Sequence, residues 1–566
     1  MSQFEIVVIA VLGVLYLILP LALKKGANTA VYSANKVPYW ISSLSLLIIY
    51  WNPTLEMINT SLVIEKGYSG LWFLKDILLT IGIAPVLFAP MWARMDLITD
   101  NQLILKRFSG LGANILSQFR AIYVGLFISA FLGSFYILGI QKIISSIFQI
   151  EEFHFFLFAF FAVIFLILKN DLSSKLRVDS IIAILYLVFI PMAIYFLITG
   201  LGGWGEMKQT LTAYHSSKIE FLPTGKEEQE TWSNIMFFVF IQWWSARLLD
   251  HSNANTQRYF SIGNPWHAFR AILFPVLVIS VMFGLSSFVW DAALITGQTN
   301  GEAAYISLML QYLPAGLKVA LLFVFIAGFL TTWEAIVSWG GSFITVDFLQ
   351  EGLGKKFNEK QAKYISYSAM LLIGWLSLVF ALMADQLADL KYFLFSISAG
   401  VGPVILLRWF WWRINAWSQL SAMVASGLLA ILYDQLRLWS PSLDLFITDW
   451  STAVGLGDYP MKLLILTPLV TLIWLVVTFN TKPDRVDHLK SFVELTKTGG
   501  IWPFPTARFF WRKKLLMIVL FAFIGILPMW IIWHLKFGSV GIAFILGLLL
   551  LAAITIVYQG MRKLLF

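Results

Sequence analysis

The chain has 566 residues, of which 59% are apolar and 13% are charged, and its mean hydropathy is +0.79. A soluble protein of this length carries about 25% charged residues, so the composition excludes a soluble globular protein and indicates a polytopic membrane protein. The absence of cysteine excludes disulfides and thiolate metal sites, and the six scattered histidines form no recognisable metal-ligand cluster.

Apolar runs of about twenty residues, the length that crosses ~30 Å of hydrocarbon, recur along the chain. We predict an all-α fold whose consecutive spans pack into one membrane domain over residues 1–566. The first span lacks a basic leader and a small-residue cleavage site, so we expect a retained helix. The fifteen predicted spans lie near 4–23, 39–59, 69–91, 114–140, 153–168, 178–202, 233–250, 267–290, 316–348, 363–385, 390–412, 417–434, 462–479, 515–534 and 538–559.

The basic residues predict the orientation, because cytoplasmic loops of membrane proteins are enriched in Lys and Arg. With the N-terminus outside, the inner loops hold 28 Lys and Arg and the outer loops hold 10. We therefore predict a multi-pass protein of the cell inner (plasma) membrane with an external N-terminus and a cytoplasmic C-terminus. The net charge of +9 is then an orientation signal, and we expect no nucleic-acid partner.

The second span, "YWISSLSLLIIYWNPTLEMIN", is interrupted near its middle by Trp51, Asn52 and Pro53. Proline lacks an amide donor and disfavours helical geometry at the preceding residue, so carbonyls around residues 48–51 lose their helical donors. Broken helices with free carbonyls bind cations in membrane transporters, whereas a simple proline kink would have no ligand. Glu56, one turn further on, is predicted to be either a site residue or an interfacial charge.

The third span, "SGLWFLKDILLTIGIAP", carries adjacent opposite charges at Lys75 and Asp76. Neighbouring positions on a helix point about 100° apart, so these two side chains do not face each other. Each of them needs a partner elsewhere, a water-lined cavity, or a path back to the membrane interface.

The seventh span ends in "WSARLLDHSNANTQRYFSIGN", with Arg247 and Asp250 followed by a polar loop and the pair Gln257-Arg258. Taken alone, this pattern indicates the inner boundary of the membrane.

The ninth span, "FIAGFLTTWEAIVSWGGSFITVDF", places Thr331 and Thr332 one turn after Gly328. Two hydroxyls and an exposed carbonyl form an uncharged oxygen set that suits a monovalent cation such as Na⁺, although the hydroxyls can also bond back to their own helix. Glu334 lies on the face of Thr331. It is predicted to be a cation ligand, a proton carrier or the partner of a buried base such as Arg120.

Together these segments resemble the sodium:solute symporter family. "TQRYFSIGN" resembles the Gln-Arg signature that follows the sixth core helix of that family, and "FLTTWEAIVSWGGSFITVDF" resembles its eighth core helix. The stretch from "YSANKVPYWISSLSLLIIYWNPTLEMIN" to "LILKRFSG" resembles its first two core helices. The resemblance covers roughly residues 4–480.

The resemblance implies two inverted five-helix repeats, at 39–202 and 233–412, with a leading peripheral helix at 4–23 and C-terminal peripheral helices at 417–566. It also implies a Na⁺ site between the broken first core helix and the eighth. Position by position, the Na⁺ ligands would be the carbonyls of Ile48, Trp51 and Gly328 and the hydroxyls of Thr331 and Thr332.

Some positions depart from the sugar-binding members of the family. Leu55 and Leu74 occupy positions at which those members have a glutamine and a glutamate, and Ser245 and Leu248 replace an asparagine and a tyrosine. Glu334 stands where the family has a small residue. The candidate substrate and coupling residues are Asn52, Glu56, Lys75, Asp76, Ser245 and Glu334.

The sequence therefore predicts a secondary active transporter that moves a small organic solute into the cell together with Na⁺. A proton-coupled porter using Glu334, or a solute sensor of the same fold that does not transport, are the alternatives. An enzyme is not expected, because no metal cluster and no paired acid and nucleophile are found near one face. The expected partners are the solute, Na⁺ and the lipid bilayer, and no obligate protein partner is inferred.

Overall fold

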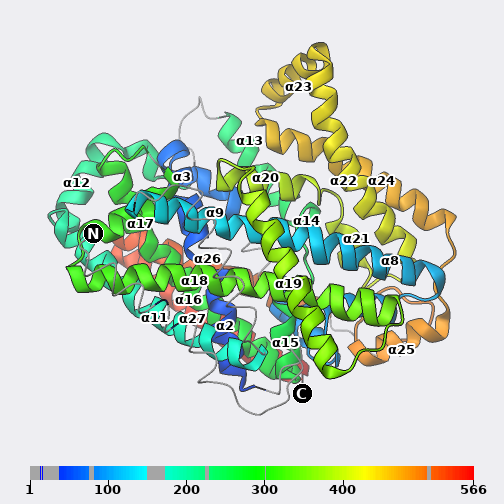
Figure 1. Ribbon diagram of the computed structural model, residues 1–566. Coiled ribbons are helices and arrows are strands. Elements are labelled where there is room, and N and C mark those ends of the chain that lie inside the picture. Colours follow the sequence, from blue (N-terminus) through cyan, green and yellow to red (C-terminus); the bar gives the residue numbers. More distant parts are fainter. Residues whose placement is uncertain are drawn as a thin grey trace.

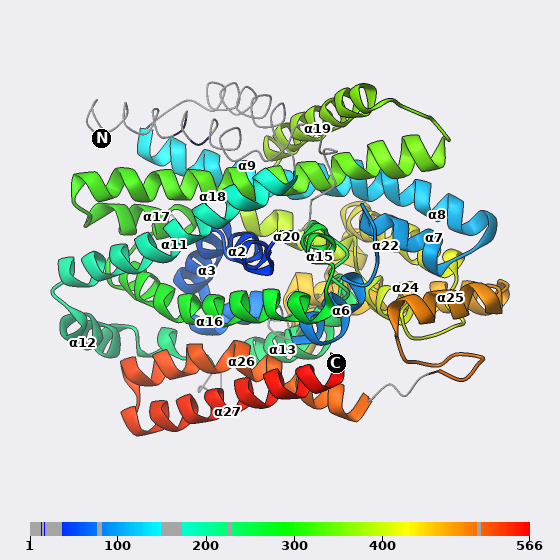
Figure 2. The same cartoon turned by 90° about the horizontal axis from the view of Figure 1, so that it is seen from below.

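The computed structural model describes Gly13, Tyr16 and residues 37–75, 82–148, 172–222, 229–299, 301–506 and 511–565. Within these ranges every regular element is a helix, and the one β-type contact is an isolated bridge between Trp411 and Ile501. Figures 1 and 2 show long helices running roughly alongside one another in a layered bundle. The predicted all-α fold is confirmed.

The helices follow one another in three groups. The first group comprises α2 (Tyr39–Tyr50), α3 (Pro53–Lys66), η1 (Tyr68–Leu71), α4 (Trp72–Lys75), η2 (Ala84–Phe88), α6 (Ala89–Trp92), η3 (Asp100–Gln102), α7 (Leu103–Arg107), α8 (Gly110–Ile122), η4 (Tyr123–Ile128), α9 (Ser129–Phe148) and α11 (Leu172–Gly200). The second comprises α12 (Trp204–Tyr214), η5 (Ser216–Ile219), α13 (Gln229–Phe237), η6 (Phe238–Gln242), α14 (Trp243–Ser245), α15 (Thr256–Ile262), α16 (Pro265–Ile295), α17 (Gly301–Gln311), α18 (Ala315–Ser342) and η7 (Phe343–Gly352). The third comprises α19 (Glu359–Ala381), α20 (Leu387–Ser396), α21 (Gly402–Leu407), α22 (Ala416–Trp439), α23 (Pro441–Val454), α24 (Asp458–Asn480), α25 (Val486–Thr496), α26 (Trp511–Phe537) and α27 (Val540–Leu565).

Nine helices of the described residues are long and apolar enough to cross a membrane. They correspond to the predicted spans that begin near 114, 178, 267, 316, 363, 417, 462, 515 and 538. The spans predicted at 39–59 and 390–412 are each divided into two shorter helices, and the span predicted at 233–250 runs through α13, η6 and α14 and ends at Ser245. Residues 76–81 of the span predicted at 69–91 lie outside the described residues. The spans predicted at 4–23 and 153–168 lie outside the described residues, apart from Gly13 and Tyr16.

The centre of the bundle is formed by α18, which packs against α2, α9, α11 and α19. Its neighbours α8 and α9 are joined by the π-helical turn η4, and α18 itself continues into the π-helical stretch η7. Where these helices cross, large side chains such as Trp51, Trp333 and Trp339 are almost completely buried. A membrane bundle relies on this close packing, because lipid offers no hydrophobic drive for helix association.

The C-terminal helices α26 and α27 pack against each other and against α16, along one flank of the bundle (Figure 2). On the side seen at the top of Figure 1, α23 and the adjoining ends of α22 and α24 project from the bundle. Both regions lie at the periphery of the bundle. The candidate site described below lies mainly among the helices from α2 to α21.

Candidate cation and substrate site

The predicted interruption of the second span is present. Helix α2 ends at Tyr50 and α3 begins at Pro53, while Trp51 and Asn52 adopt extended backbone geometry. Pro53 occupies the first turn of α3, where its missing amide is tolerated. The break leaves the last carbonyls of α2, including that of Ile48, without the continuing helix that would supply their donors.

Asn52 bonds to both sides of the break. Its side-chain amide donates to the carbonyl of Ile49 (3.0 Å), and its side-chain oxygen accepts from the amide of Leu55 (3.4 Å). In a continuous helix the amide of Leu55 would donate to the carbonyl of Trp51, but here it turns to Asn52. Asn52 also lies within hydrogen-bonding reach of the Tyr136 hydroxyl on α9. The side chain therefore caps α3 and holds the interrupted segment in place.

The predicted α18 residues lie next to this break. Gly328 faces it so closely that an added Cβ would lie 3.6 Å from Ile48 and from Pro53, and 3.4 Å from Tyr186. The Thr332 hydroxyl donates to the carbonyl of Gly328 (2.9 Å), so two of the proposed ligand oxygens are already neighbours. The sequence left open whether the threonine hydroxyls bond back to their own helix, and the hydroxyl of Thr332 does so.

Thr331 has a different neighbour. Its hydroxyl lies 2.7 Å from the hydroxyl of Tyr16, and both side chains are buried. The oxygens that Gly328, Thr331 and Thr332 supply are thus a carbonyl and two hydroxyls without net charge. This uncharged donor set fits a monovalent cation such as Na⁺.

Glu334 pairs with Lys175 of α11. The Lys175 ammonium lies 4.0 Å from a carboxylate oxygen of Glu334, and little of either side chain is exposed. The Arg120 partner that the sequence offered is wrong, since Arg120 forms its ion pair with Asp100 at 3.3 Å. The physical reason is position: Arg120 lies in the last turn of α8, where the Phe343 ring of η7 is its neighbour.

A second ion pair joins α11 to α15. Arg258 donates to Asp179 (3.1 Å), to the hydroxyl of Ser45 on α2 (3.1 Å) and to the carbonyl of Ala254 (2.8 Å). The Ser45 hydroxyl in turn donates to Asp179. The Gln-Arg motif is therefore more than a membrane boundary, because its arginine connects the first half of the broken helix to α11.

Glu56 is fully buried and therefore does not lie at the surface as an interfacial charge. Its carboxylate accepts a hydrogen bond from the Trp51 indole (2.9 Å). This bond holds the carboxylate of Glu56 beside the break. The Trp51 ring meets Tyr186 edge to face with centroids 4.9 Å apart. Glu56, Trp51 and Tyr186 thus form one wall beside the interrupted segment.

The remaining predicted residues lie away from the break or outside the described residues. Ser245 is buried at the end of α14, and its carbonyl accepts from the amide of Gly400 between α20 and α21 (2.9 Å). Lys75 is the last described residue of α4, and Asp76 lies outside the described residues. The structure therefore brings together most of the predicted site residues, namely Ile48, Trp51, Asn52, Glu56, Gly328, Thr331 and Thr332. Glu334 lies next to this group on α18.

Sequence reasoning missed four residues of this region: Tyr16, Ser45, Lys175 and Asp179. Lys175 was counted only among the positive residues of an inner loop, although it begins a long helix. Asp179 lies inside a predicted span, and an acid in that position is a functional candidate by default. The rule that ionisable residues inside spans are functional candidates could have identified Asp179. It could not have identified Tyr16.

Residues 57–426, more than half of the chain, match the family model described as the sodium:solute symporter family. Among solved structures, the chain is similar to a Na⁺-coupled sialic acid symporter in its substrate-bound, outward-open state. The identity is 13%, 86% of this chain and 99% of that chain are covered, and the TM-score is 0.63. A nucleobase-cation-symport-1 family transporter in a closed conformation matches at 14% identity, with 84% and 100% coverage and a TM-score of 0.36.

No curated protein matches the sequence. The family match begins inside α3 and includes the Gln-Arg motif and the whole of α18. The structural similarity extends over almost the full length of the symporter and has the same helical arrangement. The chain therefore belongs to the sodium:solute symporter family.

Proposed function

We propose that this protein is a Na⁺-coupled symporter that carries a small organic solute into the cell by alternating access. The observation that carries the proposal is the close approach of Gly328 on α18 to Ile48 and Pro53 at the break between α2 and α3. One cation at this junction would contact two helices that belong to different predicted repeats. The family membership supports this proposal.

In this proposal Na⁺ is bound by the carbonyls of Ile48, Trp51 and Gly328 and by the hydroxyls of Thr331 and Thr332. To accept the cation, Thr332 directs its hydroxyl lone pairs toward the break, and Thr331 donates its proton to Tyr16. Binding then links α18 to the interrupted helix. A cation can shift the conformational equilibrium only by its differential affinity, so the outward-open state must be the one that this contact favours.

The solute is proposed to bind on the other side of the interrupted segment, within reach of Asn52 and Glu56. The buried carboxylate of Glu56 favours a solute with a cationic or zwitterionic group, whereas Lys75 would suit an anionic one. We assign Glu334 to neutralising Lys175 rather than to carrying protons, because its ammonium neighbour is present in the structure.

The first experiment is equilibrium binding of ²²Na⁺ to the purified protein in proteoliposomes, with no solute added. The variant Thr331→Ala/Thr332→Ala is compared with Thr467→Ala/Thr471→Ala, which removes two buried hydroxyls from the peripheral helix α24. We expect saturable Na⁺ binding that only the first variant loses. Failure of the folded wild-type protein to bind Na⁺ would contradict the proposal.

The proposed orientation has a direct test, because the chain contains no cysteine. Single cysteines at Ser217 and at Lys356, both exposed, are labelled in intact cells with a membrane-impermeant maleimide. We expect Ser217→Cys to react from outside and Lys356→Cys to react only after permeabilisation. The reverse pattern would overturn the predicted external N-terminus.

A further inference from the structure

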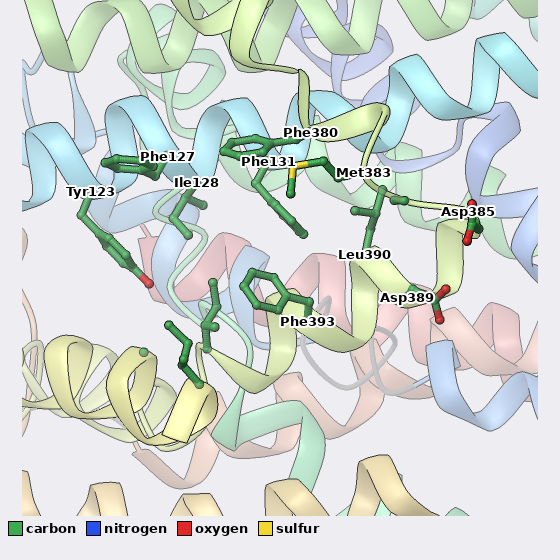
Figure 3. A pocket seen from close by; sticks show the side chains of 14 residues that line it. Tyr123, Phe127, Ile128, Phe131, Phe380, Met383, Asp385, Asp389, Leu390 and Phe393 are labelled. Carbon is green, nitrogen blue, oxygen red and sulfur yellow. The ribbon is translucent and has the colours of Figure 1, made fainter. Parts of the chain in front are cut away.

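A cavity of about 720 Å³ lies outside the proposed transport site. It is lined by η4 and α9 on one side, by the end of α19 and by α20 on another, and by α22 at its base (Figure 3). None of its lining residues belongs to the group around the broken helix. The volume lies within the ~300–1,000 Å³ typical of small-molecule sites.

Five aromatic rings contribute to the wall. Phe131 lies 5.0 Å from Phe393 and 6.0 Å from Phe380 between ring centroids, and Tyr123 and Phe127 continue the surface along η4. Figure 3 shows these rings around one elongated space. Aromatic faces carry negative partial charge and attract organic cations as well as apolar groups.

Two carboxylates, those of Asp385 and Asp389, lie at one end of this space (Figure 3). Among the described residues neither forms a salt bridge, and the nearby Lys142 is paired with Glu302. Desolvation and the neighbouring charge of Asp385 raise the pKa of Asp389, and the nearby Lys142 acts in the opposite direction. Two like charges that raise each other's energy would be relieved by a cation between them.

The cavity opens along the flank of the bundle. Its lining residues Phe127, Phe393 and Ile431 are 49%, 41% and 52% exposed. Exposed apolar side chains on membrane-crossing helices face lipid, so a ligand can enter sideways from the bilayer. Asp385 lies in the turn between α19 and α20, Asp389 lies in the first turn of α20, and both side chains are exposed.

We propose that this cavity binds an amphipathic organic amine whose apolar body lies among the aromatic rings and whose protonated nitrogen meets Asp385 and Asp389. Shape and charge point to the same ligand class. An anionic amphiphile would bring a like charge to the carboxylates, and an uncharged chain would add no counter-charge to that of the nearby Lys142. The occupant is thus a free hydrophobic amine that partitions from the membrane.

The test uses a benzophenone-bearing dodecylamine as photoprobe on the full-length protein in phosphatidylcholine proteoliposomes. An alcohol with the same skeleton is the uncharged control. We expect saturable labelling of peptides from α9, α19 or α20 by the amine, competition by dodecylamine, and little saturable labelling by the alcohol. Equal labelling by the two probes would overturn the proposal, because the cavity would then accept any lipid chain.

Variants separate charge from shape. Asp389→Asn and Asp385→Asn should each reduce the affinity for the amine about five- to tenfold, corresponding to about one kcal/mol. Asp449→Asn removes an exposed acid from α23 and should leave labelling unchanged. Unchanged labelling of both cavity variants would overturn the proposal. Competition by phosphatidylethanolamine vesicles as effective as that of dodecylamine would also overturn it, in favour of a lipid occupant.

Photolabelling of the cavity requires neither Na⁺ nor transport of a solute. Loss of Na⁺ binding in Thr331→Ala/Thr332→Ala would leave the labelling in place, and loss of labelling in Asp389→Asn would leave ²²Na⁺ binding in place. The two proposals can therefore fail independently.

Discussion

Lys175 of α11 and Glu334 of α18 face each other across the bundle with 4.0 Å between ammonium and carboxylate. Glu334 lies three residues beyond Thr331 and shares its face of α18, so this ion pair stands beside one of the proposed Na⁺ ligands. The ammonium of Lys175 therefore lies next to the proposed Na⁺ site. In the proposed function the glutamate in the apolar span is its counter-charge.

Replacing Glu334 by glutamine should destabilise the protein by about 3–5 kcal/mol, because it leaves a buried ammonium without its partner. The double variant Lys175→Met/Glu334→Gln should recover most of that loss, since it removes both charges. Thermal unfolding in detergent measures both. The exposed Glu359→Gln is the matched control. Equal stability of Glu334→Gln and the wild type would show that the pair contributes nothing.

Asn52→Ala should lower both stability and Na⁺ binding. Loss of the cap on α3 costs about 1 kcal/mol, and the released carbonyls near the break no longer keep one geometry. Asn358 offers a control, because it caps α19 by the same type of bond away from the break. Asn358→Ala should lose similar stability and keep its ²²Na⁺ affinity. Parallel loss of affinity in both variants would mean that stability alone controls binding.

Gly328→Ala should be tolerated, since its added Cβ meets neighbours only at ordinary van der Waals distances of 3.4–3.6 Å. Helix propensity alone favours alanine over glycine by about 1 kcal/mol. Gly328→Leu should abolish Na⁺ binding by pushing α18 away from Ile48 and Pro53. Size-exclusion profiles and ²²Na⁺ binding check both variants.

Gly340 gives the contrasting case on the same helix. An added Cβ there would collide with the Gly125 carbonyl and with Ser129. Gly340→Ala should therefore fail to fold properly where Gly328→Ala does not. Normal yield and melting of Gly340→Ala would contradict the packing of α18 against η4 and α9.

His251, in the loop between α14 and α15, should make the protein sensitive to acid. Burial lowers its pKa to about 4, while in the unfolded chain it stays near 6.5. The unfolded chain then binds the extra proton between these values, so stability is complete above pH 6.5 and falls as the pH drops toward 4. The melting temperature between pH 7.5 and 4.5 measures this loss.

His251→Asn should flatten that part of the pH profile. Asparagine tolerates the left-handed backbone of this position, where φ is +57°, and does not titrate. His215→Asn, at a partly exposed position between α12 and η5, is the control and should keep the wild-type profile. A profile of His251→Asn identical to the wild type would assign the acid sensitivity to other groups.

The break at Trp51 and Asn52 could be predicted because its cause is local, namely the missing amide of Pro53. The long helices are likewise signalled by the length of their apolar runs. Interrupted spans were harder. The span predicted at 390–412 contains Gly400, Gly402 and Pro403, which mark the gap between the end of α20 at Ser396 and the start of α21 at Gly402, but the length of the apolar run outweighed this signal.

Partners across the bundle could not be predicted. Glu334 required a base, but Arg120 and Lys175 are both far from it in the sequence, and only the packing of α11 against α18 selects Lys175. The same holds for the hydroxyl contact between Tyr16 and Thr331, which are 315 residues apart. Local patterns identify polar groups that need a partner, whereas the fold decides which partner they have.

At the periphery, Lys536 of α26 forms a buried ion pair with Asp291 of α16, and its ammonium also donates to the hydroxyl of Ser287 (2.8 Å). Asp291 is synthesised 245 residues before its lysine, so the acid enters the membrane while its counter-charge is still untranslated. Domains generally form in the order of synthesis. We expect the core to stay incomplete until the last helical hairpin inserts, so chains stopped before Lys536 should be recognised by membrane proteases as unfinished.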